Sequence, residues 1–88
     1  MYKIHFSRIA EKEYKSLHKK NILIFKKIRS ALLSLAGNPY IGKPLKLSLK
    51  GKWSYRAGVY RIIYSIEKKI LTIHILDIGH RKYVYKVK

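Results

Sequence analysis

The first residues alternate between polar and apolar side chains, and a helical pattern follows them. Within Tyr2–Phe6 the side chains of Tyr2, Ile4 and Phe6 fall on one face, which is the period of a half-buried strand. Ser7 can cap a helix, in which Ala10, Tyr14 and Leu17 recur at helical spacing as far as His18-Lys19-Lys20. The pattern therefore predicts a strand that leads directly into a first helix.

A second helix follows almost at once. Asn21 can cap it, and Gly37-Asn38-Pro39 stops it. Its apolar stripe has the i, i+3, i+4, i+7 spacing and consists of Ile24, Phe25, Ile28, Ala31, Leu32 and Leu35. Lys20, Lys26 and Lys27 fall off this stripe, so a solvated charged face is the favoured interpretation of them. Two helices with so short a joint form a hairpin.

The second half of the chain has the pattern of strands. In the connector 40–50, Leu45, Leu47 and Leu49 alternate as at the beginning of a strand. Segments rich in Ile, Tyr and Val then run over Trp53–Arg56, Val59–Ile66 and Ile70–Ile78, separated by Ala57-Gly58 and Glu67-Lys68-Lys69. In the last segment Leu71, Ile73 and Ile75 share one face. We predict an α+β fold with an N-terminal strand, a two-helix hairpin and a three-stranded antiparallel meander, which form a twisted sheet packed on the helices.

Length and composition bound the kind of protein. The 88 residues, 48% of them hydrophobic, suffice for one compact domain over residues 1–88. The chain has no cysteine, so no disulfide is available, and its first residues do not resemble a signal peptide. No apolar run approaches the ~20 residues that span a bilayer. These features predict a cytoplasmic protein.

Charge changes the picture most. The 21 Lys and Arg against 4 Asp and Glu leave a net charge of +17, and no acidic residue lies between Glu13 and Glu67. Such a field destabilises the isolated fold by self-repulsion and attracts polyanions, which favours a nucleic acid or an acidic protein as partner. A lysine-rich surface that only reflects biased composition is the plain alternative. Membrane-surface binding is disfavoured, because the helices lack a Trp/Phe-rich face opposite their lysines.

Several classes of site are excluded by the residues present. The four acids are scattered, so paired-carboxylate catalysis is disfavoured. The four histidines lack the close spacing of a zinc site, and Gly42-Lys43-Pro44 is not a phosphate-binding loop. His74, within a strand, is better explained as a structural residue than as a ligand.

Basic and aromatic residues in the strands and the C-terminal tail remain as candidates: Lys50, Lys52, Arg56, Arg61, His80, Arg81, Tyr83 and Tyr85. Cleavage of an RNA phosphodiester needs removal of the 2′-hydroxyl proton, stabilisation of a phosphorane-like dianion and protonation of the 5′ leaving oxygen. Lysine and arginine can serve all three steps. Tyr83 or Tyr85 can stack on a base. On spacing alone, binding of phosphate without chemistry is an equal alternative.

Two segments together resemble a known superfamily. Trp53-Ser54-Tyr55-Arg56-Ala57-Gly58-Val59-Tyr60-Arg61-Ile62-Ile63-Tyr64, followed by Ile75-Leu76-Asp77-Ile78-Gly79-His80-Arg81-Lys82-Tyr83-Val84-Tyr85, is similar to the RelE/ParE toxins. The early strand, the helical hairpin and the connector Gly42-Lys43-Pro44-Leu45 are similar as well. The resemblance implies the toxin of a type II toxin–antitoxin system, with the α+β fold predicted above.

The two branches of this superfamily differ in target. RelE-like members are mRNA interferases that cut message in the ribosomal A site and inhibit translation, whereas ParE-like members poison DNA gyrase. The RelE branch is known for a lysine before the Gly-x-Tyr-Arg turn, the arginine of that turn, a later arginine and a terminal tyrosine. In this sequence the matching positions are Lys52, Arg61, Arg81 and Tyr85. The resemblance therefore implies a ribosome-dependent endoribonuclease without metal or other cofactor. A gyrase inhibitor and a non-catalytic RNA-binding protein of the same fold remain alternatives.

The resemblance also implies roles for these residues. Lys52 would abstract the proton and Arg61 would stabilise the phosphorane. Arg81 would assist the leaving group, and Tyr85 would stack on the substrate. The sequence departs from the pattern at Ser54, where a second lysine is expected, so Lys50 or His80 could take the role of base.

Two of these assignments have structural alternatives. His80 could be a plain hydrogen-bond donor, and Arg61 could be an ion-pair partner of Asp77 or Glu67. For the intact protein the resemblance implies an acidic, RelB-like antitoxin as partner, besides the ribosome and mRNA. We expect that antitoxin to cover apolar groups such as Leu17 or Leu45, and no membrane partner is expected.

Overall fold

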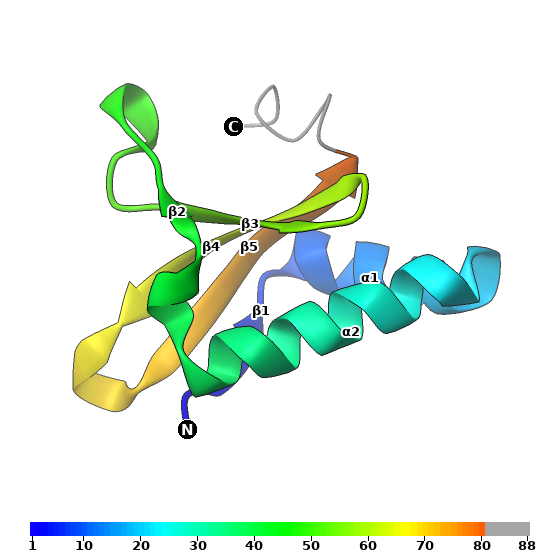
Figure 1. Cartoon of the computed structure of the whole chain (residues 1–88), viewed down its shortest axis with the longest axis horizontal. Coiled ribbons are helices and arrows are strands. Elements are labelled where there is room, and N and C mark those ends of the chain that lie inside the picture. The colour runs from blue at the N-terminus through cyan, green and yellow to red at the C-terminus, as the bar shows by residue number, and fades with distance from the viewer. Residues whose placement is uncertain (81–88) are drawn as a thin grey trace.

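The computed structural model describes residues 1–80, which form a five-stranded sheet with two helices packed on one of its faces (Figure 1). The elements are β1 (Lys3–Phe6), α1 (Arg8–Lys20), α2 (Ile22–Gly37), β2 (Lys43–Pro44), β3 (Trp53–Ala57), β4 (Tyr60–Glu67) and β5 (Thr72–His80). The strand order is β1-β5-β4-β3-β2, with β1 parallel to β5 and every other pair antiparallel. The predicted α+β class and the β3-β4-β5 meander are confirmed. The sheet has one more strand than predicted, the two-residue β2.

The helix boundaries lie where the capping residues predicted them. The Ser7 hydroxyl accepts a hydrogen bond from the Ala10 amide at 3.0 Å, and the Asn21 side chain accepts one from the Ile24 amide at 3.3 Å. Asn38 ends α2. Because short polar side chains satisfy the otherwise unpaired amides of a first helical turn, the local sequence determines both helix starts. None of the helices in residues 1–80 is long and apolar enough to cross a membrane.

One core lies between the sheet and the helices. Its buried members are Ala10, Leu17, Ile28, Ala31, Leu32, Leu35, Ala57, Ile62, Tyr64, Ile73, Ile75 and Ile78. Leu17 is only 3% exposed and therefore belongs to this core. The expectation that the free protein exposes Leu17 to a partner is wrong, because the α1 stripe buries it against the sheet.

The strand suggested by Leu45, Leu47 and Leu49 does not form. Pairing with β3 stops at Pro44, and residues Leu47–Leu49 form a 3-10 turn in which Leu47 has a φ of +58° and is 91% exposed. The loop closes on itself, since the Leu45 amide donates to the Lys52 carbonyl at 2.9 Å. Alternation failed here because these leucines have no sheet face to cover.

The start of the last strand also differs from the prediction. Residues Lys68–Ile70 form a 3-10 turn, Leu71 adopts the left-handed conformation, and β5 begins at Thr72. Ile70 and Leu71 are both exposed, so Leu71 does not share the buried face of Ile73 and Ile75. A tight turn after Glu67 takes up the residues that the pattern assigned to the strand.

A bulge in β5 changes which of its residues face the helices. Ile63 lies opposite Asp77 and Tyr64 opposite Ile75, which leaves Leu76 as an extra residue. The Leu76 carbonyl accepts a hydrogen bond from the Ser7 hydroxyl at 2.8 Å. Ser7 therefore joins the start of α1 to the bulge in addition to capping the helix.

We expect Ser7→Ala to lower the free energy of unfolding by about 1–2 kcal/mol, because it removes a helix cap and the partner of a half-buried carbonyl. Thermal unfolding followed by circular dichroism measures this as a lower Tm. Ser48→Ala, in the exposed loop, is the matched control and should change stability by less than about 0.5 kcal/mol. Equal Tm values for the two variants would show that the double role of Ser7 contributes nothing.

Candidate nucleic-acid interface

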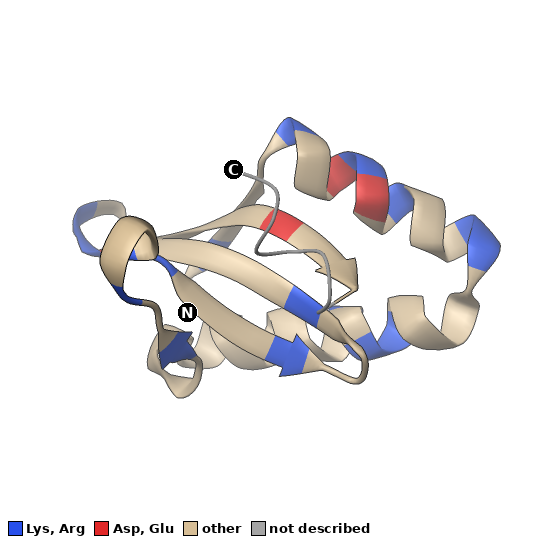
Figure 2. Ribbon diagram, turned by 90° about the horizontal axis from the view of Figure 1, so that it is seen from above, with Lys and Arg blue, Asp and Glu red and all other residues tan. Residues whose placement is uncertain are grey.

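The sheet has a second face, away from the helices, that carries basic residues. Tyr60, Ile62 and Tyr64 of β4 pack in or against the core, so Arg61 points to the opposite side of the strand. Arg56 of β3 lies directly opposite Arg61 in the register. Figure 2 shows these basic positions side by side on β3 and β4. We call this side of β3, β4 and β5 the open face, because neither helix covers it; Ser54 and Ile63 on it are nevertheless almost fully buried.

Arg61 is held by a residue of the neighbouring strand. Its Nη1 donates to the Ser54 Oγ at 3.1 Å, and the Ser54 side chain is almost fully buried. Arg56 is exposed, and its Nε donates to the Gly58 carbonyl at 3.2 Å. Like charges directly opposite each other on antiparallel strands repel, so an anion bound between the two guanidinium groups would relieve that repulsion.

Asp77 is the acidic residue of the described chain nearest in register to this arginine pair. It lies opposite Ile63, two positions from Gly79, which is opposite Arg61. Burial raises the pKa of the Asp77 carboxyl, and a hydrogen bond from the Ile78 backbone partly offsets that rise.

Glu67 is not placed to be the partner of Arg61. The two residues are six positions apart on β4, a separation of roughly 20 Å in an extended strand. The Glu67 carboxylate instead contacts His74, with Oε1 and Nε2 2.7 Å apart, and the His74 ring makes an edge contact with His5. The expectation that His74 is a structural residue fits this placement.

The two candidate lysines precede β3. Lys52 is half-buried, and its amide donates to the Leu49 carbonyl at 3.0 Å, which fixes its backbone one residue before the strand. Lys50 is exposed at the end of the 3-10 turn. The loop thus delivers Lys52 to the end of β3 that carries Ser54, while Lys50 lies farther out in solvent.

The C-terminal candidates divide between two regions. His80 lies opposite Tyr60, with ring centroids 6.2 Å apart, and Tyr60 packs against the core. His80 is therefore on the helix-facing side of the sheet and not on the open face with Arg61. Arg81, Tyr83 and Tyr85 lie outside the described residues.

Ser54 is the functional candidate that the sequence pattern did not identify. In the sequence, Ser54 was noted only because it occupies a position where a lysine is expected. In the structure it accepts a hydrogen bond from Arg61. The signal that could have found it is the Ala57-Gly58 turn. Once that turn sets the hairpin register, Ser54 falls on the same side of β3 as Arg56, two pairs along the hairpin from the Arg56–Arg61 pair.

Comparisons with known proteins match nearly the whole chain. The family model described as the ParE toxin of type II toxin–antitoxin systems matches residues 4–85. Toxin RelG of Mycobacterium tuberculosis is 30% identical over 86 residues, which are 97% of this chain and 97% of RelG.

Solved structures agree with this result. The toxin–antitoxin complex RelBE2 of Mycobacterium tuberculosis contains a chain that is 32% identical, with a TM-score of 0.78 over 91% of this chain and 98% of that chain. A chain of the YoeB-YefM complex from Staphylococcus aureus is 27% identical, with a TM-score of 0.78 over 91% and 97% of the two chains. The likeness therefore extends over nearly the whole molecule.

Proposed function

We propose that this chain, which belongs to the family of ParE toxins of type II toxin–antitoxin systems, is a metal-independent endoribonuclease that cuts mRNA in the ribosomal A site. The chain is a toxin of the RelE/ParE superfamily. The observation that carries the proposal is Arg61, held by the buried Ser54 beside Arg56 on an open sheet face. A guanidinium group held in place, with a second cation on the adjacent strand, matches the charge of a cleaving phosphodiester.

The proposed reaction is an intramolecular displacement at phosphorus. The 2′-oxygen of the RNA attacks the phosphorus, the bond to the 5′-oxygen breaks, and a 2′,3′-cyclic phosphate and a 5′-hydroxyl result. Lys52 in its neutral form accepts the 2′-hydroxyl proton, and Arg61 donates hydrogen bonds to the non-bridging oxygens as their charge grows. The leaving 5′-oxygen takes a proton from water while Arg81 stabilises its developing charge, and Tyr85 stacks on a substrate base. Because the nucleophile and leaving group belong to one substrate, positioning and charge stabilisation are the protein's main contributions.

The choice of base follows from the placement of the alternatives. Lys52 immediately precedes the strand that carries Ser54 and Arg56, whereas Lys50 lies out in the loop and His80 lies on the helix-facing side. Lys52 is therefore the base favoured here. Arg56 and Tyr83 are assigned to RNA binding.

A second candidate function is inhibition of DNA gyrase, which the match to the ParE family model favours. An in vitro translation reaction followed by primer extension on the message separates the two. The proposed nuclease yields codon-phased cuts in the message. Intact message together with inhibited supercoiling would instead identify the gyrase function.

Ser54 provides a test of how Arg61 is positioned. We expect Ser54→Ala to lower kcat for message cleavage by about 10-fold with little change in KM, because the guanidinium loses the acceptor that orients it. Ser54→Thr keeps a hydroxyl and should retain most of the activity. Equal cleavage by the alanine variant and the wild type would remove Ser54 from the account.

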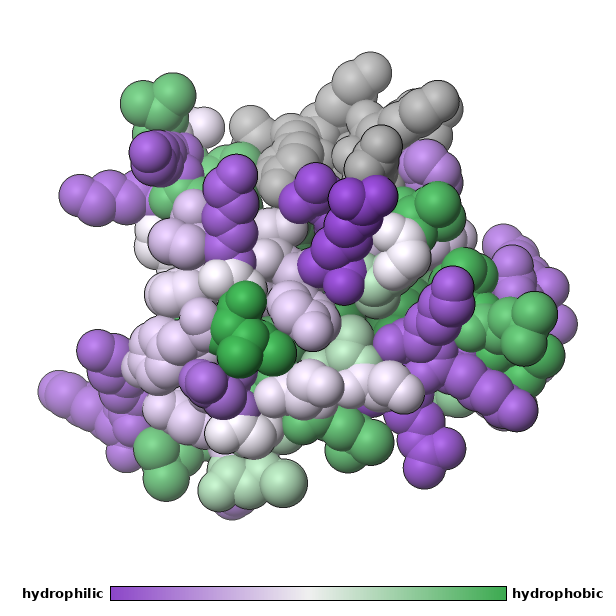
Figure 3. Space-filling model, viewed as in Figure 1, coloured by the Kyte–Doolittle hydropathy of each residue, from purple (hydrophilic) through white to green (hydrophobic). Residues whose placement is uncertain are grey.

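We further propose that an acidic antitoxin holds the toxin inactive in the cell. RelBE2 was solved as a toxin–antitoxin complex and YoeB in complex with YefM, and a net charge of +17 favours an acidic counterpart. Apolar groups are also exposed beside lysines where α1 joins α2 (Figure 3), including Ile22 and Leu23. Leu45 is half-buried and remains available to such a partner, unlike Leu17.

Purification from the native host tests this partner. An antitoxin that combines charge attraction with apolar burial should remain bound through a wash at about 1 M salt, where the Debye length is about 3 Å. Recovery of the toxin alone, both before and after the wash, would overturn the proposal.

A further inference from the structure

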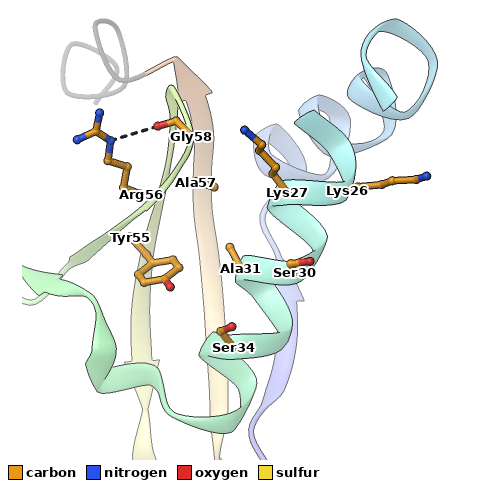
Figure 4. A pocket seen from close by; sticks show the side chains of 9 residues that line it. All are labelled: Lys26, Lys27, Ser30, Ala31, Ser34, Tyr55, Arg56, Ala57 and Gly58. Carbon is orange, nitrogen blue, oxygen red and sulfur yellow. Dashed lines mark hydrogen bonds between the residues drawn. The ribbon is translucent and has the colours of Figure 1, made fainter. Parts of the chain in front are cut away.

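A groove lies beside the open face, between α2 and the outer edge of β3 (Figure 4). It has a volume of about 470 Å³, and its lining includes Lys27, Ser30, Ser34, Tyr55, Arg56 and Gly58. We call it the α2–β3 groove. It exists because β2 pairs only with Trp53 and Ser54, so within the described chain no strand lies alongside residues 55–57 at the outer edge of β3.

Two cations lie at the β3–β4 turn, at one end of the groove, on the two sides of Gly58 (Figure 4). The Arg56 Nε donates to the Gly58 carbonyl, and a Cβ built on Gly58 would lie 3.5 Å from the Lys27 Cδ and 3.7 Å from its Nζ. Lys27 therefore reaches from α2 across to the turn, as Figure 4 shows. Its neighbour Lys26 points away from β3 in the same view.

The rest of the lining is suited to a polyanion that carries flat rings. No acidic residue of the described chain lines the groove, while the hydroxyls of Ser30 and Ser34 provide donors along α2. The Tyr55 ring projects into the space between the strand and the helix (Figure 4). Cations for phosphates next to an aromatic ring for a base are the combination that binds single-stranded nucleic acid.

We propose that the α2–β3 groove binds single-stranded RNA, with a phosphate held between Lys27 and Arg56 and a base stacked on Tyr55. The inference rests on the proposed function, because Arg56 belongs to both surfaces: it lines the groove and lies opposite Arg61. A strand that leaves the open face thus passes over the turn and into the groove. An acidic polypeptide would also match the charges, but it would make no use of the ring or of the continuity with the open face.

The test measures binding of a short single-stranded RNA whose riboses are 2′-O-methylated, so that it cannot be cleaved. Fluorescence anisotropy is recorded over a range of salt for the wild type, Lys27→Gln and Lys20→Gln. We expect Lys27→Gln to weaken binding by roughly 5- to 10-fold at low salt and to reduce the slope of log K against log salt by about 0.7, the value for one phosphate of a single strand. Lys20→Gln removes the same charge from an exposed lysine that does not line the groove, and should change affinity by less than about 2-fold.

Tyr55 gives an independent arm. Tyr55→Leu should weaken binding by roughly 5-fold or more through lost stacking, without changing the salt slope, and Tyr55→Phe should bind like the wild type. If the leucine variant does not fold, the two lysine variants still decide the proposal.

Three outcomes would overturn it. Equal losses from the two lysine variants would mean that only overall charge matters, and an unchanged slope in Lys27→Gln would remove the phosphate contact. A Lys27→Gln variant that binds RNA normally but loses affinity for a glutamate-rich peptide would identify a polypeptide site. Because this RNA is not cleaved, the binding test is independent of nuclease activity. If the wild type cuts no message but its RNA affinity shows the Lys27-dependent salt slope, the proposed nuclease function is refuted and the proposed RNA site in the groove is supported.

Discussion

Arg61→Ala should lower message cleavage by about 100-fold or more, the scale on which a charge-stabilising group contributes to a transition state. Arg61 presents its guanidinium beside Arg56 on the open face and is oriented by Ser54, so it is in place before substrate arrives. Single-turnover cleavage on programmed ribosomes is the measurement. Arg61→Lys keeps the charge but loses the planar fork, and we expect it to recover only part of the rate.

The same substitution should leave the fold nearly unchanged. It removes the hydrogen bond to Ser54, worth about 1 kcal/mol, but also removes the repulsion of the directly opposite Arg56. A Tm within a few degrees of the wild type is therefore expected. A variant that unfolds at room temperature would make Arg61 a structural residue and withdraw its catalytic role.

Gly42→Ala should have the largest effect on stability, a loss of about 3–5 kcal/mol. A Cβ at Gly42 would lie 2.1 Å from the Tyr64 Oη and 2.9 Å from the Ser54 carbonyl oxygen. The Tyr64 hydroxyl is buried and donates to the Pro39 carbonyl at 2.7 Å, and burial raises the pKa of Tyr64 to about 12, so it remains a donor at neutral pH. The new methyl group must displace this ring, and the hydrogen bond is lost with it.

Thermal unfolding measures this loss, at about 4–8 °C of Tm for each kcal/mol in a domain of this size. Tyr64→Phe removes the atom in closest conflict, so the double variant Gly42→Ala/Tyr64→Phe should be more stable than Gly42→Ala alone. Gly37→Ala is the control, because a Cβ there meets nothing within 4 Å. A Gly42→Ala protein that melts with the wild type would contradict the close approach of Gly42 to Tyr64.

The sequence pattern predicted the elements best where local chemistry decides them. Ser7, Asn21 and the Gly37-Asn38-Pro39 stop fixed both helices, and the Ala57-Gly58 turn, with Gly58 at a φ of +65°, fixed the hairpin that brings Arg56 opposite Arg61. Alternation could not anticipate the loop after Leu45. Its leucines alternate without a face to cover, and only the backbone bond between Leu45 and Lys52 shows that the segment turns back.

The bulge at Leu76 explains why the candidate residue His80 lies on the helix-facing side of the sheet and not on the open face with Arg61. Counted from the buried Ile73 and Ile75, strict alternation would turn Asp77 to the helices and His80 to the open face. The extra residue reverses both, so that Asp77 joins the open face and His80 lies beside Tyr60. A bulge depends on how two strands register, and a single strand's pattern carries no sign of it.

The chemistry of the cut ends tests the central claim most directly. Message fragments from a translation reaction containing the toxin are isolated and their termini identified by mass spectrometry. Attack by the 2′-oxygen, with Arg61 stabilising the phosphorane, predicts a 2′,3′-cyclic phosphate or its opened 3′-phosphate on one fragment and a 5′-hydroxyl on the other. Fragments that carry a 5′-phosphate and a 3′-hydroxyl would require water to attack in place of the 2′-oxygen and would contradict the account.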